Sequence, residues 1–124
     1  MKAINSTEKR LANEVFEKIP TVDRNAVQEM LKSELADLNK KIIVLDDDPT
    51  GVQTVHDISV YTDWSVDSIE KGFAEDNAMF FILTNSRGFT AAETEKAHKE
   101  IAENASEVAK RHGKEFIVIS PPYA

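Results

Sequence analysis

The chain has 124 residues, a length that suits one domain able to bury roughly two thirds of its unfolded surface. Its formal net charge is −7 and no segment is strongly basic, which disfavours binding to nucleic acids or anionic membranes because both need clustered Lys and Arg. There is no cysteine and no apolar run of membrane-spanning length. We therefore expect a cytoplasmic protein without disulfides.

The first part of the chain, residues 1–40, is expected to form a separate helical segment. Ser6 or Thr7 can cap a first helix, and Thr21 or Asp23 can cap a second. The apolar residues of the second helix recur with helical spacing: Ala26, Val27, Met30, Leu31, Leu35 and Leu38. No catalytic pattern occurs here. We interpret the pair as packing elements, with a lid or an oligomer contact as the alternatives.

Residues 41–124 alternate between short apolar runs and helical patterns. Strands are predicted at 42–45, 58–62, 78–83 and 116–119, and helices at about 65–74 and 90–113. Alternating strands and helices favour parallel pairing with right-handed crossovers. The predicted fold class is therefore α/β, with three layers, a mainly parallel sheet flanked by helices, and an N-terminal helical pair.

An acidic turn follows the first apolar strand directly. It contains Asp46, Asp47 and Asp48, then Thr50 and Gly51. Nothing in a core would neutralise three adjacent carboxylates, so the chain must reach the surface there. In open α/β sheets ligands bind outside the carboxyl ends of the strands, so the turn occupies the edge where this fold class carries its chemistry.

Each residue type in the turn suits ligand binding. In extended geometry Asp46 and Asp48 face one side and Asp47 the other. Close carboxylates raise one another's pKa, which suits a general base, or they hold a divalent cation. Thr50 can donate to a ligand oxygen, and Gly51 permits close backbone approach or a positive φ. The alternative is an acidic turn that caps its own backbone, and we favour a function because the turn follows a buried strand.

A second polar turn follows the 78–83 strand. Thr84, Asn85 and Ser86 precede Arg87, whose guanidinium is suited to bidentate binding of a carboxylate or phosphate. The alternative is a surface arginine in a polar turn. Because the carboxyl ends of parallel strands meet at one edge, both turns and Ser120 are expected to converge.

Other residues carry weaker signals. His56 follows the acidic turn and could orient a substrate, although an ordinary loop histidine is the better interpretation. Tyr61 and Trp64 are interpreted as packing residues. The sequence has no Gly-rich phosphate loop, which weighs against nucleotide binding by this segment.

The stretch 43–57, together with the second turn, resembles the four-carbon acid sugar kinase family, whose members act on threonate, erythronate and 3-oxo-tetronate. The similarity spans about residues 41–120. The family's Asp-Asp-x-Thr-Gly and Thr-x-Ser-Arg motifs fall on Asp47, Asp48, Thr50 and Gly51 and on Thr84, Ser86 and Arg87. The combination of the two turns is more specific than either alone.

The resemblance implies that residues 41–124 are part of an N-terminal domain that binds the sugar acid, whereas a C-terminal domain, absent here, binds ATP with Mg. The implied reaction is phosphoryl transfer from ATP to a substrate hydroxyl. In it Asp47 or Asp48 accepts the hydroxyl proton or binds the polyol, and Arg87 takes the substrate carboxylate. The remaining turn residues are expected to bind substrate: Asp46, Thr50, Gly51, Thr84 and Ser86.

One departure from the family affects activity. A third family motif, Ser-Arg-x-Asp-Ser-Thr-Leu-Arg-Gly, should begin at about Ser120, where this chain continues Pro121, Pro122, Tyr123 and Ala124. The expected acid and arginine cluster is therefore missing. We expect that this chain cannot phosphorylate a substrate alone, and that it binds neither ATP nor a metal by itself.

Two other interpretations remain open. In a haloacid-dehalogenase-type phosphatase, Asp46 would be the nucleophile, Asp48 the acid or base and Mg the cofactor. The chain has no room for that family's later motifs. The non-enzymatic alternative is a sugar-acid-binding or regulatory module, or a fragment that forms homo-oligomers through an exposed sheet edge.

Overall fold

The computed structural model describes residues 13–120, in two compact units that divide between residues 36 and 37. The first unit contains a short 3-10 helix, η1 (Asn13–Lys18), and most of helix α1 (Arg24–Asp37). Asp23 caps α1, because its Oδ1 accepts the backbone N–H groups of Asn25 and Ala26 at 3.0 and 3.1 Å. The predicted second helix is thus confirmed, whereas the caps expected for the first helix at Ser6 and Thr7 lie outside the described residues.

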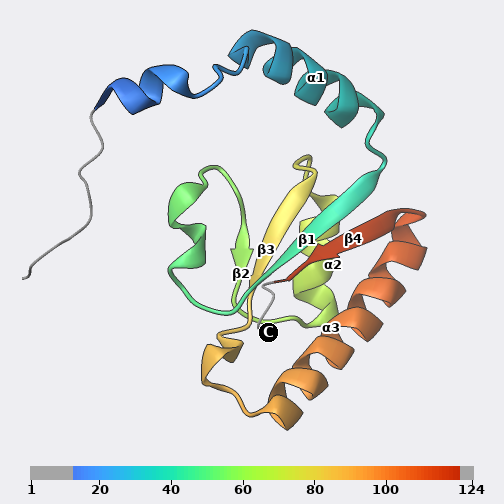
Figure 1. The fold of residues 1–124 in the computed structure, drawn as a ribbon. Helices are drawn as coiled ribbons and strands as arrows, with labels where there is room; N and C mark the ends of the chain where they lie inside the picture. Colours follow the sequence, from blue (N-terminus) through green and yellow to red (C-terminus); the bar gives the residue numbers. More distant parts are fainter. Residues whose placement is uncertain (1–12, 121–124) are drawn as a thin grey trace, which may run out of the picture. The chain divides into compact units, whose positions relative to one another are not determined.

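The second unit is built on a parallel sheet of four strands in the order β2-β3-β1-β4 (Figure 1). The strands are β1 (Lys40–Asp46), β2 (Val60–Tyr61), β3 (Met79–Leu83) and β4 (Glu115–Ile119). The central strand β1 pairs with β3 and β4, so Val44 lies opposite Phe81 on one side and Ile119 on the other. Parallel pairing brings the carboxyl ends of β1 and β3 to the same edge.

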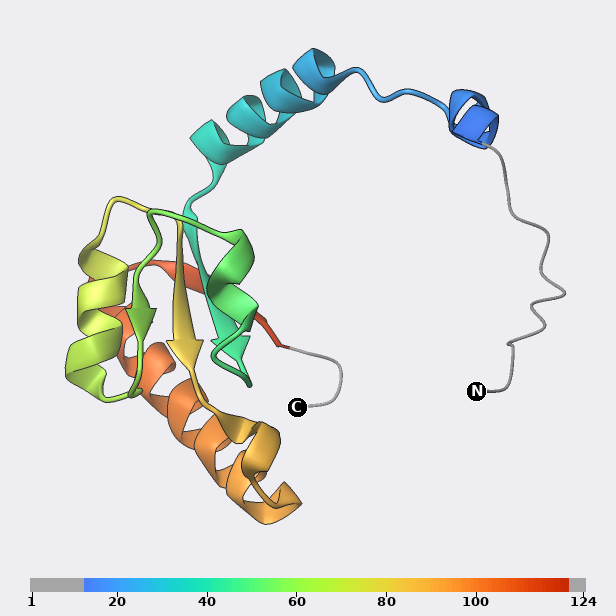
Figure 2. The ribbon, with the colours of Figure 1, turned by 90° about the vertical axis from the view of Figure 1, so that its left-hand side faces the viewer.

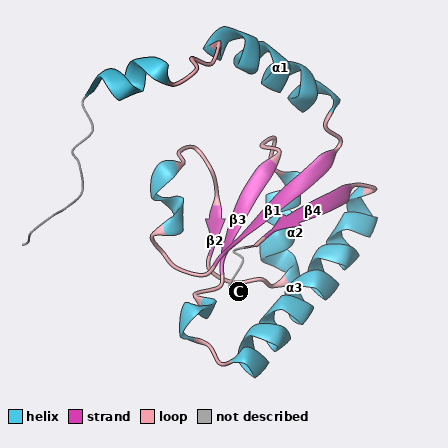
Figure 3. Ribbon diagram, in the orientation of Figure 1, coloured by secondary structure: helices cyan, strands magenta, loops and turns pink. Residues whose placement is uncertain are grey.

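Two helices connect the strands, α2 (Val66–Ala74) and α3 (Ala91–His112), as the alternation of colours in Figure 3 shows. The predicted capping box opens α3, with Thr90 and Glu93 each bonding the other's backbone N–H. Gly113 ends α3 with a left-handed φ of 61°. The predicted α/β class, a parallel sheet flanked by helices, is confirmed.

Both helices pack on the same face of the sheet. The connections from β2 to β3 and from β3 to β4 run in the same direction across the sheet, so right-handed crossovers place α2 and α3 together. The connection from β1 to β2 runs the opposite way, and its short 3-10 helix η2 (Gly51–Thr54) lies on the other side (Figure 2). The core between helices and sheet is formed mainly by Ile43, Leu45, Ile69, Phe73, Phe80, Ile82, Ile101, Ala105 and Val108.

Tyr61 and Trp64 are packing residues, as predicted, because both pack against this core. The Tyr61 ring meets Phe80 edge-on with centroids 5.7 Å apart, and burial raises the pKa of its hydroxyl to about 12. Trp64 Nε1 donates a hydrogen bond to Glu100 Oε2 at 3.1 Å. No helix among residues 13–120 is both long and apolar enough to cross a bilayer.

Candidate functional site

Backbone hydrogen bonds join the turns after β1 and β3 at the carboxyl edge of the sheet. The N–H of Thr84 donates to the carbonyl of Asp46 at 2.9 Å, and the N–H of Arg87 donates to the carbonyl of Asp47 at 3.2 Å. The Thr84 hydroxyl lies 3.1 Å from the same Asp46 carbonyl and 2.9 Å from Ser86 Oγ. Thr84 and Ser86 are both buried, and the Thr84 hydroxyl joins the two turns while the Ser86 hydroxyl contacts Thr84 within its own turn.

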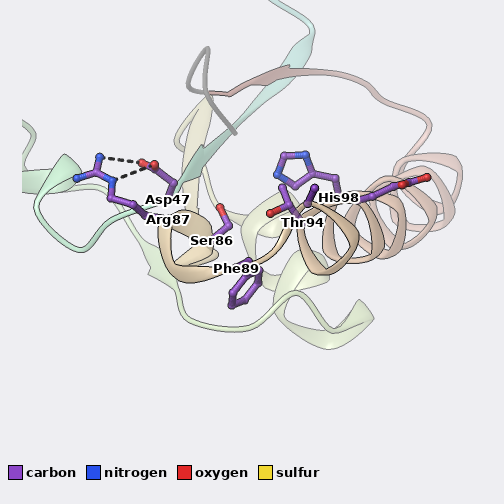
Figure 4. Close-up of a pocket in the computed structure, with 8 residues that line it drawn as sticks. Asp47, Ser86, Arg87, Phe89, Thr94 and His98 are labelled. Atoms are coloured by element: carbon purple, nitrogen blue, oxygen red, sulfur yellow. Dashed lines mark hydrogen bonds and ion pairs between the residues drawn. The ribbon is translucent and has the colours of Figure 1, made fainter.

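The Arg87 guanidinium binds two carboxylates of the acidic turn. Its Nε lies 3.2 Å from Asp47 Oδ2, and its Nη1 lies 2.8 Å from Asp48 Oδ2 (Figure 4 draws the Asp47 contacts). Hydrogen bonding to Asp47, together with the charges of Asp47 and Asp48, raises the pKa of Arg87. The two carboxylates therefore hold the guanidinium in one orientation at the rim of the sheet.

This arrangement corrects the predicted alternation, in which Asp46 and Asp48 share one side and Asp47 faces the other. The strand ends at Asp46 and the chain turns, so Asp47 and Asp48 both reach Arg87. Thr50 fixes Asp48 further, because its N–H donates to Asp48 Oδ1 at 2.8 Å and its hydroxyl donates to the same oxygen. These bonds, with a smaller contribution from Arg87, lower the pKa of Asp48.

Asp46 is separated from this group and is only 6% exposed. Its Oδ1 accepts the N–H of Asp48 at 3.3 Å, whereas its Oδ2 has no hydrogen-bond partner among residues 13–120. A Cβ on Gly51 would lie 2.3 Å from Asp46 Oδ1, so only a glycine lets the backbone at position 51 lie this close to the Asp46 carboxylate. Close backbone approach was one of the two predicted roles of Gly51. The other possibility is wrong, because the φ of Gly51 is not positive.

A pocket of about 720 Å³ opens beside the two turns (Figure 4). That volume is in the range of about 300–1,000 Å³ that is usual for small-molecule sites. Its lining comes from both turns and from the start of α3: Asp47, Ser86, Arg87, Phe89, Ala91, Thr94, Glu95 and His98. The sequence predicted the first three of these but assigned no role to the helix residues. The available signal was their spacing directly after the capping box, which places Ala91, Thr94 and His98 on one side of α3.

The other predicted residues lie outside this pocket. Asp46 and Gly51 line a smaller cavity of about 260 Å³ next to the ends of β1 and β4. His56 is fully on the surface, with its Nδ1 2.8 Å from Asp57 Oδ2, as expected for an ordinary loop histidine. Within residues 13–120, no three His, Cys, Asp or Glu side chains are grouped so that they could hold a metal ion.

The fold and the two paired turns define a parallel α/β domain with a small-molecule pocket at the carboxyl edge of its sheet. A family model described as "Sugar-binding N-terminal domain" matches residues 42–120, which is more than half of the chain. The chain belongs to this family of sugar-binding N-terminal domains. Comparisons with curated proteins and with solved structures found no match. The matched residues include both turns and every residue that lines the larger pocket.

Proposed function

We propose that this chain binds an open-chain, four-carbon sugar acid as the substrate-binding part of an ATP-dependent sugar-acid kinase. Membership in the sugar-binding family supports a sugar ligand. The kinase class and the acid ligand rest on the two motif-bearing turns and on the chemistry of their residues. The observation that carries the proposal is the exposed guanidinium of Arg87 at the wall of the pocket, beside the carboxylate of Asp47.

The proposed binding mode divides the ligand's polar groups between these two residues. Arg87 has five N–H donors, of which three contact Asp47 and Asp48, so two remain for a ligand carboxylate. Asp47 is at the pocket wall and accepts a ligand hydroxyl, whereas Asp48 does not line the pocket. Asp47 is therefore the better candidate for either predicted role, binding the polyol or accepting a hydroxyl proton.

Phosphoryl transfer depends mostly on positioning and charge stabilisation, and ATP with Mg would supply the phosphoryl group. The chain has no Gly-rich phosphate loop, and residues 13–120 contain no group of three metal-binding side chains. We assign this chain the binding and orientation of the sugar acid, with acceptance of the hydroxyl proton at Asp47 as the other role open to it.

Calorimetric titration of the protein with threonate and erythronate tests the proposal. We expect heat of binding with at least one of the two acids, loss of that heat in Arg87→Ala, and weaker binding of threitol, which has no carboxylate. Arg111→Ala is the matched control, because Arg111 pairs with Glu107 and Glu70 away from the pocket. Absence of heat with both acids would contradict the proposal and would favour an interaction or structural role.

The phosphatase alternative is less well supported by the position of Asp46. A nucleophilic carboxylate must reach the phosphorus of its substrate. Asp46 is 6% exposed, and the backbone of Gly51 lies directly against its carboxylate. Treatment with a phosphate analogue is expected to leave Asp46 unmodified, and a trapped acyl-phosphate analogue on Asp46 would favour the phosphatase instead.

A further inference from the structure

Helix α1 presents a stripe of exposed apolar side chains. The stripe consists of Val27, Met30, Leu31 and Leu35, which are between 48% and 68% exposed. These positions recur with the spacing of one side of a helix, and no residue between 13 and 37 is buried. A helix of 14 residues is only marginally stable alone in water, because most helices in proteins depend on the packing of their apolar side. We therefore expect the stripe to be covered when the protein is in solution.

The charged residues of α1 lie at unfavourable ends for an isolated helix. The positive end of a helix dipole is at the first turn and the negative end is at the last turn. α1 has no acidic residue in its first turn, which begins with Arg24, and no basic residue in its last turn, which contains Glu34 and Asp37. The capping bonds of Asp23 offset part of this at the first turn. Within residues 13–120, however, none of the other three forms an ion pair, so their charges are available to a partner.

We propose that the stripe is covered by the α1 helix of a second copy of this chain, packed antiparallel about a two-fold axis near Leu31. In such a pair each stripe lies on the other, with Val27 opposite the partner's Leu35. Arg24 then lies beside the partner's Asp37, and the two helix dipoles oppose each other. A parallel pair would bring like charges together at both ends, so charge complementarity selects the antiparallel arrangement. The contact uses no residue that lines the pocket, so it does not rest on the proposed function.

Sedimentation velocity of the full chain over a range of concentrations tests the contact. We expect the weight-average mass to rise toward twice the monomer mass, and Leu31→Lys to stay monomeric over the same range. Arg24→Glu should weaken association about fivefold, because the symmetric dimer loses two ion pairs at once. Lys99→Glu is the matched control, since it makes the same change of net charge at an exposed position of α3 and should leave association unchanged.

The orientation of the pair is tested with single introduced cysteines, because the chain has none of its own. With oxidised glutathione, Leu31→Cys should form a disulfide-linked dimer. A mixture of Val27→Cys and Leu35→Cys should cross-link more than either variant alone. Ser33→Cys, exposed on the opposite side of α1, is the control and should remain largely without cross-links.

Three results would overturn the inference. The unchanged chain could stay monomeric at every concentration, which would mean that something other than a second copy covers the stripe. The dimer could persist in Leu31→Lys, which would place the contact on another surface. Val27→Cys could cross-link with itself more than with Leu35→Cys, which would indicate a parallel pair. Each of these results leaves the proposed function standing, because that function is tested by the binding of sugar acids.

Discussion

A methyl group at position 51 would occupy space that the Asp46 carboxylate already fills, with its Cβ 2.3 Å from Oδ1. Asp46 is buried and short, so its carboxylate has little room to move away. We therefore expect Gly51→Ala to lower the free energy of unfolding by about 1–3 kcal/mol, measured by urea denaturation. Gly88→Ala is the matched control, because a Cβ there has nothing within 4 Å and its φ is not positive. Equal losses in the two variants would contradict the close-approach explanation.

The hydrogen bonds from Thr50 hold the pKa of Asp48 below its ordinary value of 3.8. Ionised Asp48 therefore favours the folded state; this contribution is complete above the ordinary pKa and is lost as pH falls through the folded-state value. Thr50→Val removes the hydroxyl donor at nearly constant shape, so we expect the pKa of Asp48 to rise in a carboxyl carbon NMR titration. Asp63, whose pKa is lowered by Ser65 and Ser68, is the internal control and should not change. An unchanged pKa of Asp48 would show that the hydroxyl contributes nothing.

At the scale of the element, the first turn of α3 depends on its capping box. The Thr90 side chain accepts the N–H of Glu93 at 3.3 Å, and the Glu93 carboxylate accepts the N–H of Thr90 at 2.7 Å. Thr90→Ala removes one of these bonds and should cost about 1 kcal/mol of stability in urea denaturation. Ser106→Ala, at an exposed position inside the same helix, is the control and should be neutral or slightly stabilising. A similar loss in both variants would indicate that the cap is not the cause.

The longer elements could be predicted from local sequence. Apolar runs indicated β1 and β3, and helical spacing with a capping box indicated α3. The strand predicted at 58–62 shrinks to Val60–Tyr61 in the structure. Asp57, with a φ of 56°, bends the chain before β2, and the Asp63 carboxylate accepts the N–H of Ser65 and bends it afterwards. These side-chain effects act over two or three residues and are invisible to a pattern of apolar residues.

The candidate site shows the same limit. Parallel pairing was enough to predict that Asp47 and Arg87 meet at one rim, and they do. Arg87 pairs with both Asp47 and Asp48 because β1 ends at Asp46 and the chain turns there. A pattern of alternating strand residues does not specify this end point. The contribution of His98 to the pocket depends on the packing of α3 against the sheet. Its spacing after the capping box places it on one side of the helix, but that spacing does not specify what this side faces.

At the scale of the whole molecule, the second compact unit contains its own core. All the residues of the core cluster, and those packed against it, lie between Ile43 and Phe116. We therefore expect a chain that begins at Asp37 to unfold at the same urea midpoint as the 124-residue chain, followed by tryptophan fluorescence of Trp64. A midpoint lowered by the equivalent of about 1 kcal/mol or more would mean that residues 1–36 stabilise the sheet unit.

The pairing of the two turns joins residues 40 positions apart in the chain, Asp47 and Arg87. Neither turn alone offers a guanidinium aligned by carboxylates, so the proposed binding surface forms only when β1 and β3 have paired. A sugar acid bound there, as proposed, would have no equivalent surface on the unfolded chain. By mass action such a ligand would shift the folding equilibrium toward the assembled sheet, by an amount that grows with its concentration.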